Sequence, residues 1–184
     1  MELSKDEKNI LLKAARNSIE GIFHKHETAK IDFDFYPNLK IHAGAFVTLT
    51  INKNLRGCIG YIISNRSLFD TVCEAAIQAA IGDPRFPSLS ESELNKIKIE
   101  ISVLSPPFKM NNYDEIILGK HGLIVEENYR RGLLLPQVPI EHKLNKEEFL
   151  TALCQKAGLP ENLWQQKILN IQMFTANVFS EEDE

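Results

Sequence analysis

Cysteine is scarce in this chain of 184 residues, and its spacing argues against two classes of protein. The three cysteines are Cys58, Cys73 and Cys154, so their number is odd, and no Cys-x-x-Cys pair occurs. Neither a disulfide framework nor a zinc site built from cysteine pairs is therefore indicated. Free cysteines are typical of a reducing compartment, and we expect a cytoplasmic protein.

Long apolar runs are also missing. No stretch reaches the roughly 18 apolar residues that a membrane-spanning helix needs, and the first residues, 1–6, are polar and unlike a signal peptide. We therefore expect no membrane association. The sequence has no phosphate-binding loop, no Gly-x-Gly-x-x-Gly and no His-x-x-x-His, so no motif indicates a cofactor or a metal.

An excess of positive charge is the third absence. The net charge is -4, but residues 181–184 are all acidic, and without them the chain has 21 acidic and 21 basic residues. A protein that binds a phosphate backbone would show a basic excess, so a nucleic-acid partner is not favoured. We expect residues 1–180 to form a single domain and the acidic tail, 181–184, to fray.

The apolar pattern that is present predicts an α+β fold with a mainly antiparallel sheet and flanking helices. Capping signals at Ser4, Ser67 and Asn145 predict three helices. Strands are expected in hairpins and adjacent pairs. The predicted strands cover residues 44–51, 55–63, 97–103, 122–126, 132–135 and 168–179.

The least ordinary stretch is Leu55-Arg56-Gly57-Cys58-Ile59-Gly60, which continues a predicted strand. Glycine weakens a strand interior and is tolerated mainly where a bulge, a ligand or another backbone comes close. Strand alternation places Arg56, Cys58 and Gly60 on one face, and Leu55, Gly57, Ile59 and Tyr61 on the other.

Several motifs in a fixed order resemble the AMMECR domain family, named from the AMME-syndrome chromosomal region and including AmmeMemoRadiSam system protein A. The resemblance extends roughly from residue 10 to 179. The motifs are Gly44-Ala45-Phe46-Val47-Thr48-Leu49, Leu55-Arg56-Gly57-Cys58-Ile59-Gly60, Asp83-Pro84-Arg85-Phe86-Pro87, Ile99-Glu100-Ile101-Ser102-Val103-Leu104, Leu134-Leu135-Pro136-Gln137-Val138, and Phe149-Leu150 with Ala157-Gly158-Leu159.

The resemblance implies an α+β fold with a larger and a smaller subdomain and a cleft between them. It also implies a genomic association with a Memo-like protein and a radical SAM protein. It brings no settled activity, since an enzyme and a role near transcription or translation have both been suggested for the family.

Cys58 is the first candidate for chemistry. A thiolate nucleophile needs a neighbouring cation, which Arg56 could supply, and a base such as His121. The alternatives are that Cys58 is a small buried packing residue, or that it has a redox or ligand-contact role. His121, at the start of a predicted strand, is either that base or a histidine with a purely structural role.

Arg56 is the second candidate. It either forms an ion pair with Asp83 or Glu100, or recognises a carboxylate or phosphate with its planar guanidinium. In the second case Gly57 and Gly60 would let the ligand come close.

The loop Asp83-Pro84-Arg85-Phe86-Pro87 is the third candidate, since its prolines hold its shape. It is either the rim of a site that presents Asp83 and Arg85, or a structural corner in which Asp83 caps backbone amides and Phe86 fills the core.

These candidates predict an enzyme, or an enzyme component, that binds a small anionic or thiol-reactive substrate beside the Arg56 to Gly60 strand. Memo-like and radical SAM proteins would be its partners. The alternatives are a non-enzymatic protein-interaction module, or a role close to transcription, translation or nucleic-acid machinery.

Overall fold

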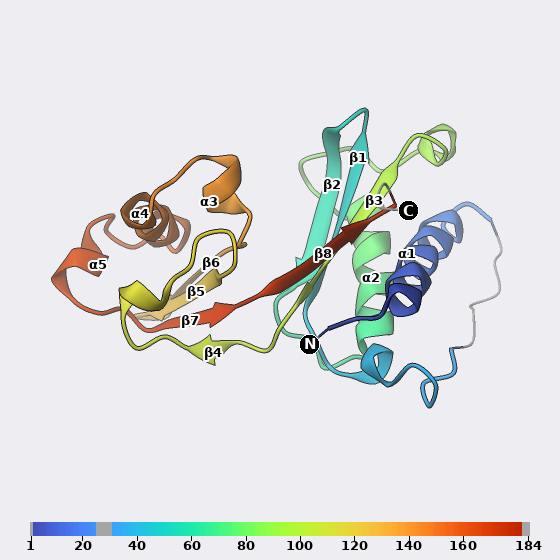
Figure 1. The fold of residues 1–184 in the computed structure, drawn as a ribbon. Coiled ribbons are helices and arrows are strands. Elements are labelled where there is room, and N and C mark those ends of the chain that lie inside the picture. The colour runs from blue at the N-terminus through green and yellow to red at the C-terminus, as the bar shows by residue number, and fades with distance from the viewer. Residues whose placement is uncertain (1, 25–30, 182–184) are drawn as a thin grey trace. The chain divides into compact units, whose positions relative to one another are not determined.

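A computed structural model of the chain describes residues 2–24 and 31–181. The chain divides into two compact units, of which unit 1 comprises 1–104 with 177–184, and unit 2 comprises 105–176. Each unit has its own four-stranded sheet (Figure 1). The predicted α+β class with mainly antiparallel strands is confirmed, but the strands form two sheets instead of one.

Unit 1 consists of one sheet with two long helices. Its strand order is β2-β1-β3-β8, and β1 is antiparallel to both β2 and β3. The elements are α1 (Lys5–Glu20), η1 (Pro37–Lys40), β1 (Ala45–Ile51), β2 (Asn54–Tyr61), α2 (Leu68–Ile81), η2 (Glu91–Glu93), β3 (Lys98–Leu104) and β8 (Ala176–Ser180).

The core of unit 1 lies between the helices and one face of the sheet. Helix α1 packs on α2 and β3, and α2 packs on β1 and β2 (Figure 1). Alternate strand residues that point toward the helices are fully buried, while Thr48, Thr50 and Glu100 on the other face are half-buried. Among the described residues of unit 1, no helix packs on that second face. The buried residues are Ala45, Val47, Leu49, Ile99, Ile101 and Val103.

Unit 2 is built around a smaller antiparallel sheet of order β4-β7-β5-β6. Helix α4 packs on β5 and β6, and buries Phe149, Leu150, Leu153 and Cys154. The elements are β4 (Phe108–Lys109), η3 (Tyr113–Glu115), β5 (Gly122–Glu127), β6 (Arg130–Leu134), α3 (Val138–Glu141), α4 (Lys146–Lys156), α5 (Leu163–Gln166) and β7 (Ile171–Phe174).

The three predicted helix starts are confirmed by their capping hydrogen bonds. Ser4 accepts from the backbone N–H of Glu7, Ser67 from that of Asp70, and the Asn145 side chain from that of Glu148. Each bond satisfies an amide that has no partner within the helix.

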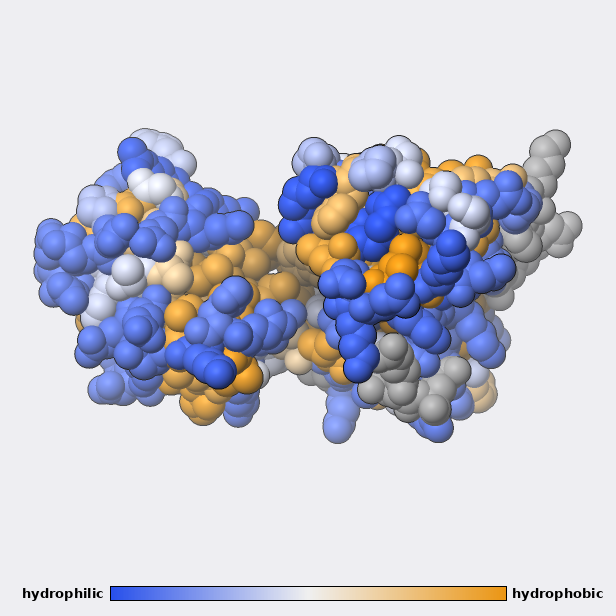
Figure 2. Space-filling view, turned by 90° about the horizontal axis from the view of Figure 1, so that it is seen from above, coloured by the Kyte–Doolittle hydropathy of each residue, from blue (hydrophilic) through white to orange (hydrophobic). Residues whose placement is uncertain are grey.

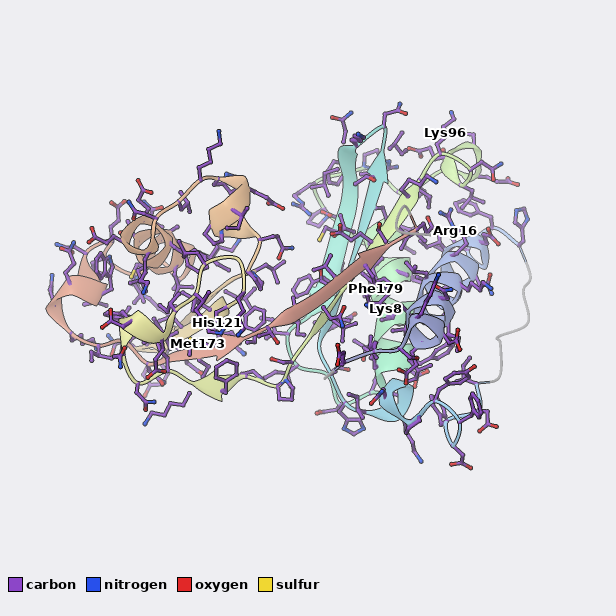
Figure 3. The ribbon with its side chains drawn as sticks, viewed as in Figure 1. Lys8, Arg16, Lys96, His121, Met173 and Phe179 are labelled. Carbon is purple, nitrogen blue, oxygen red and sulfur yellow. The ribbon has the colours of Figure 1, made fainter. Side chains whose placement is uncertain are left out.

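Two predictions about the C-terminal part of the chain were wrong. The single strand expected over 168–179 is two strands, β7 and β8, which lie in different sheets on either side of Thr175. The expected fraying does not extend to Glu181, whose carboxylate accepts two hydrogen bonds from Arg16 of α1 and one from the Ile99 amide. Figure 3 shows Arg16 on α1 beside the end of β8. Residues 182–184 of the tail lie outside the described residues.

No helix in the described ranges is long and apolar enough to cross a membrane.

Candidate functional site

A β-bulge at Arg56 decides which way the side chains of β2 point. Asn54 and Leu55 pair with Ile51 and Thr50, but Gly57 pairs with Leu49, so Arg56 is an extra residue in its strand. A shift of one residue moves side chains to the opposite face of a sheet. The bulge therefore turns Gly57 toward α2 and Cys58 toward the face without a helix.

The bulge also corrects the simple alternation expected along β2. Leu55 pairs with Thr50 and therefore shares the face of Cys58, which pairs with Thr48. Arg56, the extra residue, leaves the sheet and extends toward 87–93, since bulges commonly redirect a side chain.

Gly57 and Gly60 have different reasons to be glycine. A Cβ on Gly57 would overlap the carbonyl oxygen of Ala79, so α2 lies directly against the strand. A Cβ on Gly60 would overlap the ring of Phe46, its cross-strand partner. Protein packing, with helix or ring, thus accounts for both glycines.

The backbone of Cys58 is held by the 83–87 loop. Asp83 Oδ2 accepts from the Cys58 N–H at 2.9 Å, and Arg85 Nη2 donates to the Cys58 carbonyl at 3.3 Å. Because β2 is the edge strand of its sheet, these bonds occupy backbone groups that would otherwise be free to pair.

Asp83 and Arg85 form a bidentate ion pair with unequal exposure. Arg85 Nε and Nη2 donate to the two Asp83 oxygens at 3.0 and 2.7 Å. The Arg85 hydrogen bond, against the effect of burial, lowers the pKa of Asp83 far below its usual range, and the bond to Asp83 raises the pKa of Arg85. The Asp83 side chain is only 3% exposed but that of Arg85 is 55% exposed, so Arg85 presents charge to solvent.

The interpretation of the 83–87 loop as a structural corner is partly right, and its role as the rim of a site stays a prediction. Asp83 does cap backbone amides, those of Cys58 and Arg85. Phe86, however, is half-buried beside the Arg85 guanidinium and does not fill the core; Leu89 is the buried residue of this segment.

The ion pair of Arg56 is formed with Glu93, whereas Asp83 is paired with Arg85. Arg56 Nε and Nη2 donate to the Glu93 carboxylate at 2.7 and 3.1 Å, and Nη1 donates to the Pro87 carbonyl at 3.0 Å. The Arg56 side chain is 12% exposed. The Arg56 hydrogen bond and those from Ser90 lower the pKa of Glu93 from 4.5 to about 2. Arg56 thus fastens β2 to 87–93.

The Cys58 thiol lies on the sheet face without a helix and is half-buried, outside the apolar core. Its Sγ accepts a hydrogen bond from Thr48 Oγ1 at 3.3 Å. Glu100 is the next residue in this row, since Thr48 pairs with both Cys58 and Glu100. The Arg85 guanidinium also lies close to this side chain, because the charge of a Cys58 thiolate would raise the pKa of Arg85 further.

Thr48 connects the thiol to a hollow of about 220 Å³ in unit 1. Two ammonium groups, three hydroxyls and one carboxylate line this hollow, which can therefore offer both charge and hydrogen bonds to a small molecule. We call it the unit 1 hollow. Its lining residues are Thr48, Thr50, Lys53, Lys98, Ile99, Glu100 and Ser180.

His121 belongs to unit 2, while Cys58 belongs to unit 1. The histidine is buried, its Nδ1 accepts from the Ile117 N–H at 3.2 Å, and its ring contacts Phe108 edge-on. Burial, assisted by the charge of Lys120, lowers its pKa. These contacts give His121 a structural role in the 117–121 turn, and its role as a base stays a prediction.

Sequence reasoning missed several residues that line the unit 1 hollow, and it missed Glu93, the partner of Arg56. Thr48, Lys53, Lys98 and Ser180 come from three strands and a turn, and Glu93 comes from a 3-10 helix. Two of them had a sequence signal: Thr48 is a polar residue within an apolar strand, and Glu93 completes a capping pattern that begins at Ser90. Within the described ranges no group of three His, Cys, Asp or Glu side chains could hold a metal ion.

Comparison with known proteins agrees with this architecture. The family model AMMECR1 matches residues 12–179. A protein of Methanothermobacter thermautotrophicus is 42% identical over 186 residues, covering 98% of this chain and 97% of its own. A protein of Thermococcus onnurineus is 42% identical over 182 residues, with 94% and 89% covered.

A solved structure gives the same result. The uncharacterized protein PH0010 from Pyrococcus horikoshii matches with a TM-score of 0.88 and 36% identity, over 99% of this chain and 95% of that one. The chain is thus an α+β protein of two units, each with a helix packed on an antiparallel sheet, and its fold is shared with that solved structure. The chain belongs to the AMMECR1 family.

Proposed function

We propose that this protein is an enzyme component that binds a small anionic, thiol-reactive substrate in the unit 1 hollow, with Cys58 as the reactive group. The observation that carries the proposal is the hydrogen bond from Thr48 Oγ1 to Cys58 Sγ, because Thr48 also lines the hollow. Thr48 thus contacts both the sulfur and the hollow, which supports a role for Cys58 at this site.

The charges around the hollow favour an anion. Lys53 and Lys98 line it and are both exposed, and Arg85 presents a third cation next to Cys58. Glu100 opposes them, so the substrate would approach from the lysine side. Arg56, named in the original prediction, supports the site indirectly, since its guanidinium is occupied by Glu93 and the Pro87 carbonyl.

The chemistry assigned to Cys58 is a nucleophilic substitution. Its Sγ forms a bond to an electrophilic carbon, and the leaving group departs with the electrons of the bond that breaks. The thiol proton passes to bulk water, and the Thr48 hydroxyl, which donates a hydrogen bond to the sulfur, orients it. Later steps would belong to partner proteins, for which the family association with Memo-like and radical SAM proteins is the support.

The test compares two alkylating agents of similar size, iodoacetate, an anion, and iodoacetamide, which is neutral. Cys58 is expected to react at least about tenfold faster than Cys73, whose pKa is raised by burial. The iodoacetate to iodoacetamide rate ratio should fall about threefold in K98Q and in R85Q, as expected for losing one nearby cation.

R85K keeps the charge and should restore most of the ratio. R66Q changes an arginine that pairs with Glu74, outside the hollow and away from the Cys58 backbone that Arg85 bonds, and should leave the ratio unchanged. Sites of alkylation are read by peptide mass spectrometry. Equal alkylation rates at Cys58 and Cys73 would refute the proposal. An iodoacetate to iodoacetamide ratio that is the same in K98Q as in the unchanged protein would also refute it.

The second candidate function is a protein-interaction module, which exposed apolar side chains of unit 1 favour. Leu55, Ile63 and Val178 are among them. On the face of unit 1 that Figure 2 shows, however, hydrophobic residues lie among hydrophilic ones and not alone. Alkylation that shows no preference for Cys58 would shift the evidence toward this second function.

A further inference from the structure

In the part of the chain that the structure describes, the two sheets end in the edge strands β2, β8, β4 and β6, and three of these are protected. On β2, the side chains of Asp83 and Arg85 occupy the outward backbone groups of Cys58. Strand β6 carries the exposed, charged Arg130 and Arg131, and β4 has two residues and follows two prolines. Charges, prolines, short strands and covering loops are the usual means by which proteins keep an edge from pairing with another strand.

Strand β8, the second edge of the unit 1 sheet, has none of these features. Its sequence is Ala176-Asn177-Val178-Phe179-Ser180, without a charged residue or a proline. An uncharged edge of this length is a template for a further strand.

The hydrogen bonds at the two ends of β8 show which of its backbone groups face outward. The Ser105 N–H donates to the Thr175 carbonyl, and the Glu181 N–H donates to the Ile99 carbonyl. Strands β3 and β8 are therefore antiparallel with the same register at both ends, which leaves no bulge between them. Because bonding groups alternate along such a pair, residues 177 and 179 bond to β3, and residues 176, 178 and 180 direct theirs away from the sheet.

Val178 is the middle residue of these three. Its neighbour Phe179 is buried in the core of unit 1, so alternation places the Val178 side chain on the sheet face without a helix, where it is 43% exposed. Within the described ranges its N–H and C=O groups form no hydrogen bond. Val178 thus offers a donor, an acceptor and an apolar side chain to a strand that lies alongside.

We propose that β8 pairs with β8 of a second copy of this chain, antiparallel about a two-fold axis at Val178. Val178 then lies opposite the partner's Val178, and Ser180 lies opposite the partner's Ala176. The outward groups of the two copies face each other in this register, and no like charges meet because the strand carries none. The two unit 1 sheets become continuous, and the second copy borders the unit 1 hollow at Ser180.

The experiment measures the mass of the full chain by sedimentation equilibrium over a range of protein concentrations, and the unchanged protein is expected to dimerise. V178P removes an outward N–H but no bond to β3, and V178K brings two ammonium groups together at the axis. Each should weaken dimerisation at least about tenfold. V178T keeps the N–H and the branched shape and should dimerise like the unchanged protein. A monomer at every concentration, or a V178P dimer as tight as that of V178T, would overturn the proposal.

A mixture of V178K and V178E tests the register, because only this two-fold axis places residue 178 opposite itself. Neither variant should dimerise alone, and the mixture should. L55K is the matched control, since Leu55 is 42% exposed on the same face at the opposite edge of the sheet and should leave the dimer intact. Thermal melting followed by far-UV circular dichroism shows whether each variant is folded. A mixture that stays monomeric, or a dimer lost in L55K, would contradict pairing through β8.

Discussion

Each of the two units packs a helix directly against a strand glycine, but at different positions along the helix. In unit 1, Gly57 of β2 lies under the carbonyl of Ala79, which is inside α2. In unit 2, Gly132 of β6 lies under Ala157, the residue that ends α4. A residue inside a packed helix cannot move alone, whereas a residue at a helix end can move by a few tenths of an ångström.

The two units also differ in the residues that lie next to each glycine along its strand. Gly57 permits a tight helix contact on one face of β2, and its neighbour Cys58 then faces the side that has no helix. In unit 2 the corresponding neighbours of Gly132 are Arg131 and Leu133, which carry no comparable nucleophile. Close helix packing is therefore common to both units, while the reactive side chain is particular to unit 1.

The largest expected effect comes from filling these two glycine positions. G57A should destabilise unit 1 by about 3 kcal/mol, because the whole of α2 must shift, and G132A should destabilise unit 2 by about 1–2 kcal/mol. Denaturant unfolding is followed by far-UV circular dichroism and by the fluorescence of Trp164, the single tryptophan, which lies in unit 2.

G57A should move the circular dichroism transition while leaving that of Trp164 in place, and G132A should move the Trp164 transition. If both signals shift together in either variant, the units unfold as one body and the comparison between them fails. If G132A costs as much as G57A, the position along the helix does not matter.

A smaller effect is expected from the ion pair that fastens β2. The pKa of Glu93 is lowered from 4.5 to about 2 in the folded protein. A lowered folded pKa contributes stability that is present above the unfolded pKa and is lost as pH falls toward 2. E93Q should therefore destabilise unit 1 by about 2–3 kcal/mol at neutral pH, and this loss should shrink steadily below pH 4.5.

E74Q is the control for E93Q in the same unit. Glu74 is paired with Arg66, which is 62% exposed, so its loss should cost under about 0.5 kcal/mol at any pH. An E93Q effect that is independent of pH would show that the charge of Glu93 does not stabilise unit 1.

How far the sequence predicts this molecule depends on how local each feature is. The helix starts at Ser4, Ser67 and Asn145 follow from capping residues within one turn, and the hairpin arms follow from apolar alternation. The break at Thr175 was missed because apolar residues continue on both sides of it, and only pairing with separate sheets reveals it.

The candidate site shows the same limit. The motif around Cys58 was visible in the sequence, but the direction of the thiol depends on the bulge at Arg56. Without that bulge, the turn at 52–53 would set Leu49 opposite Arg56 and Thr48 opposite Gly57, and Cys58 would face α2. The choice of Glu93 over Asp83 as the partner of Arg56 likewise depends on the path of the chain after two prolines.

The smallest expected effect concerns the hairpin turns, which the two units share. Asn52-Lys53 and Asn128-Tyr129 are both two-residue turns with positive φ, and Lys53 and Tyr129 both have φ of 64°. Positive φ strains a residue with a Cβ, and glycine relieves that strain while losing more entropy on folding. K53G and Y129G should each stabilise their own unit by about 0.5 kcal/mol.

The two turns differ in one respect that these variants can separate. The Tyr129 side chain is fully exposed, so Y129G should change stability alone. Lys53 lines the unit 1 hollow, so K53G should also lower the iodoacetate to iodoacetamide ratio at Cys58. Equal stability gains with an unequal effect on alkylation would show that the turns are equivalent in structure and that only the one in unit 1 serves the site. A loss of stability in Y129G would mean instead that the Tyr129 ring stabilises unit 2 although it is fully exposed.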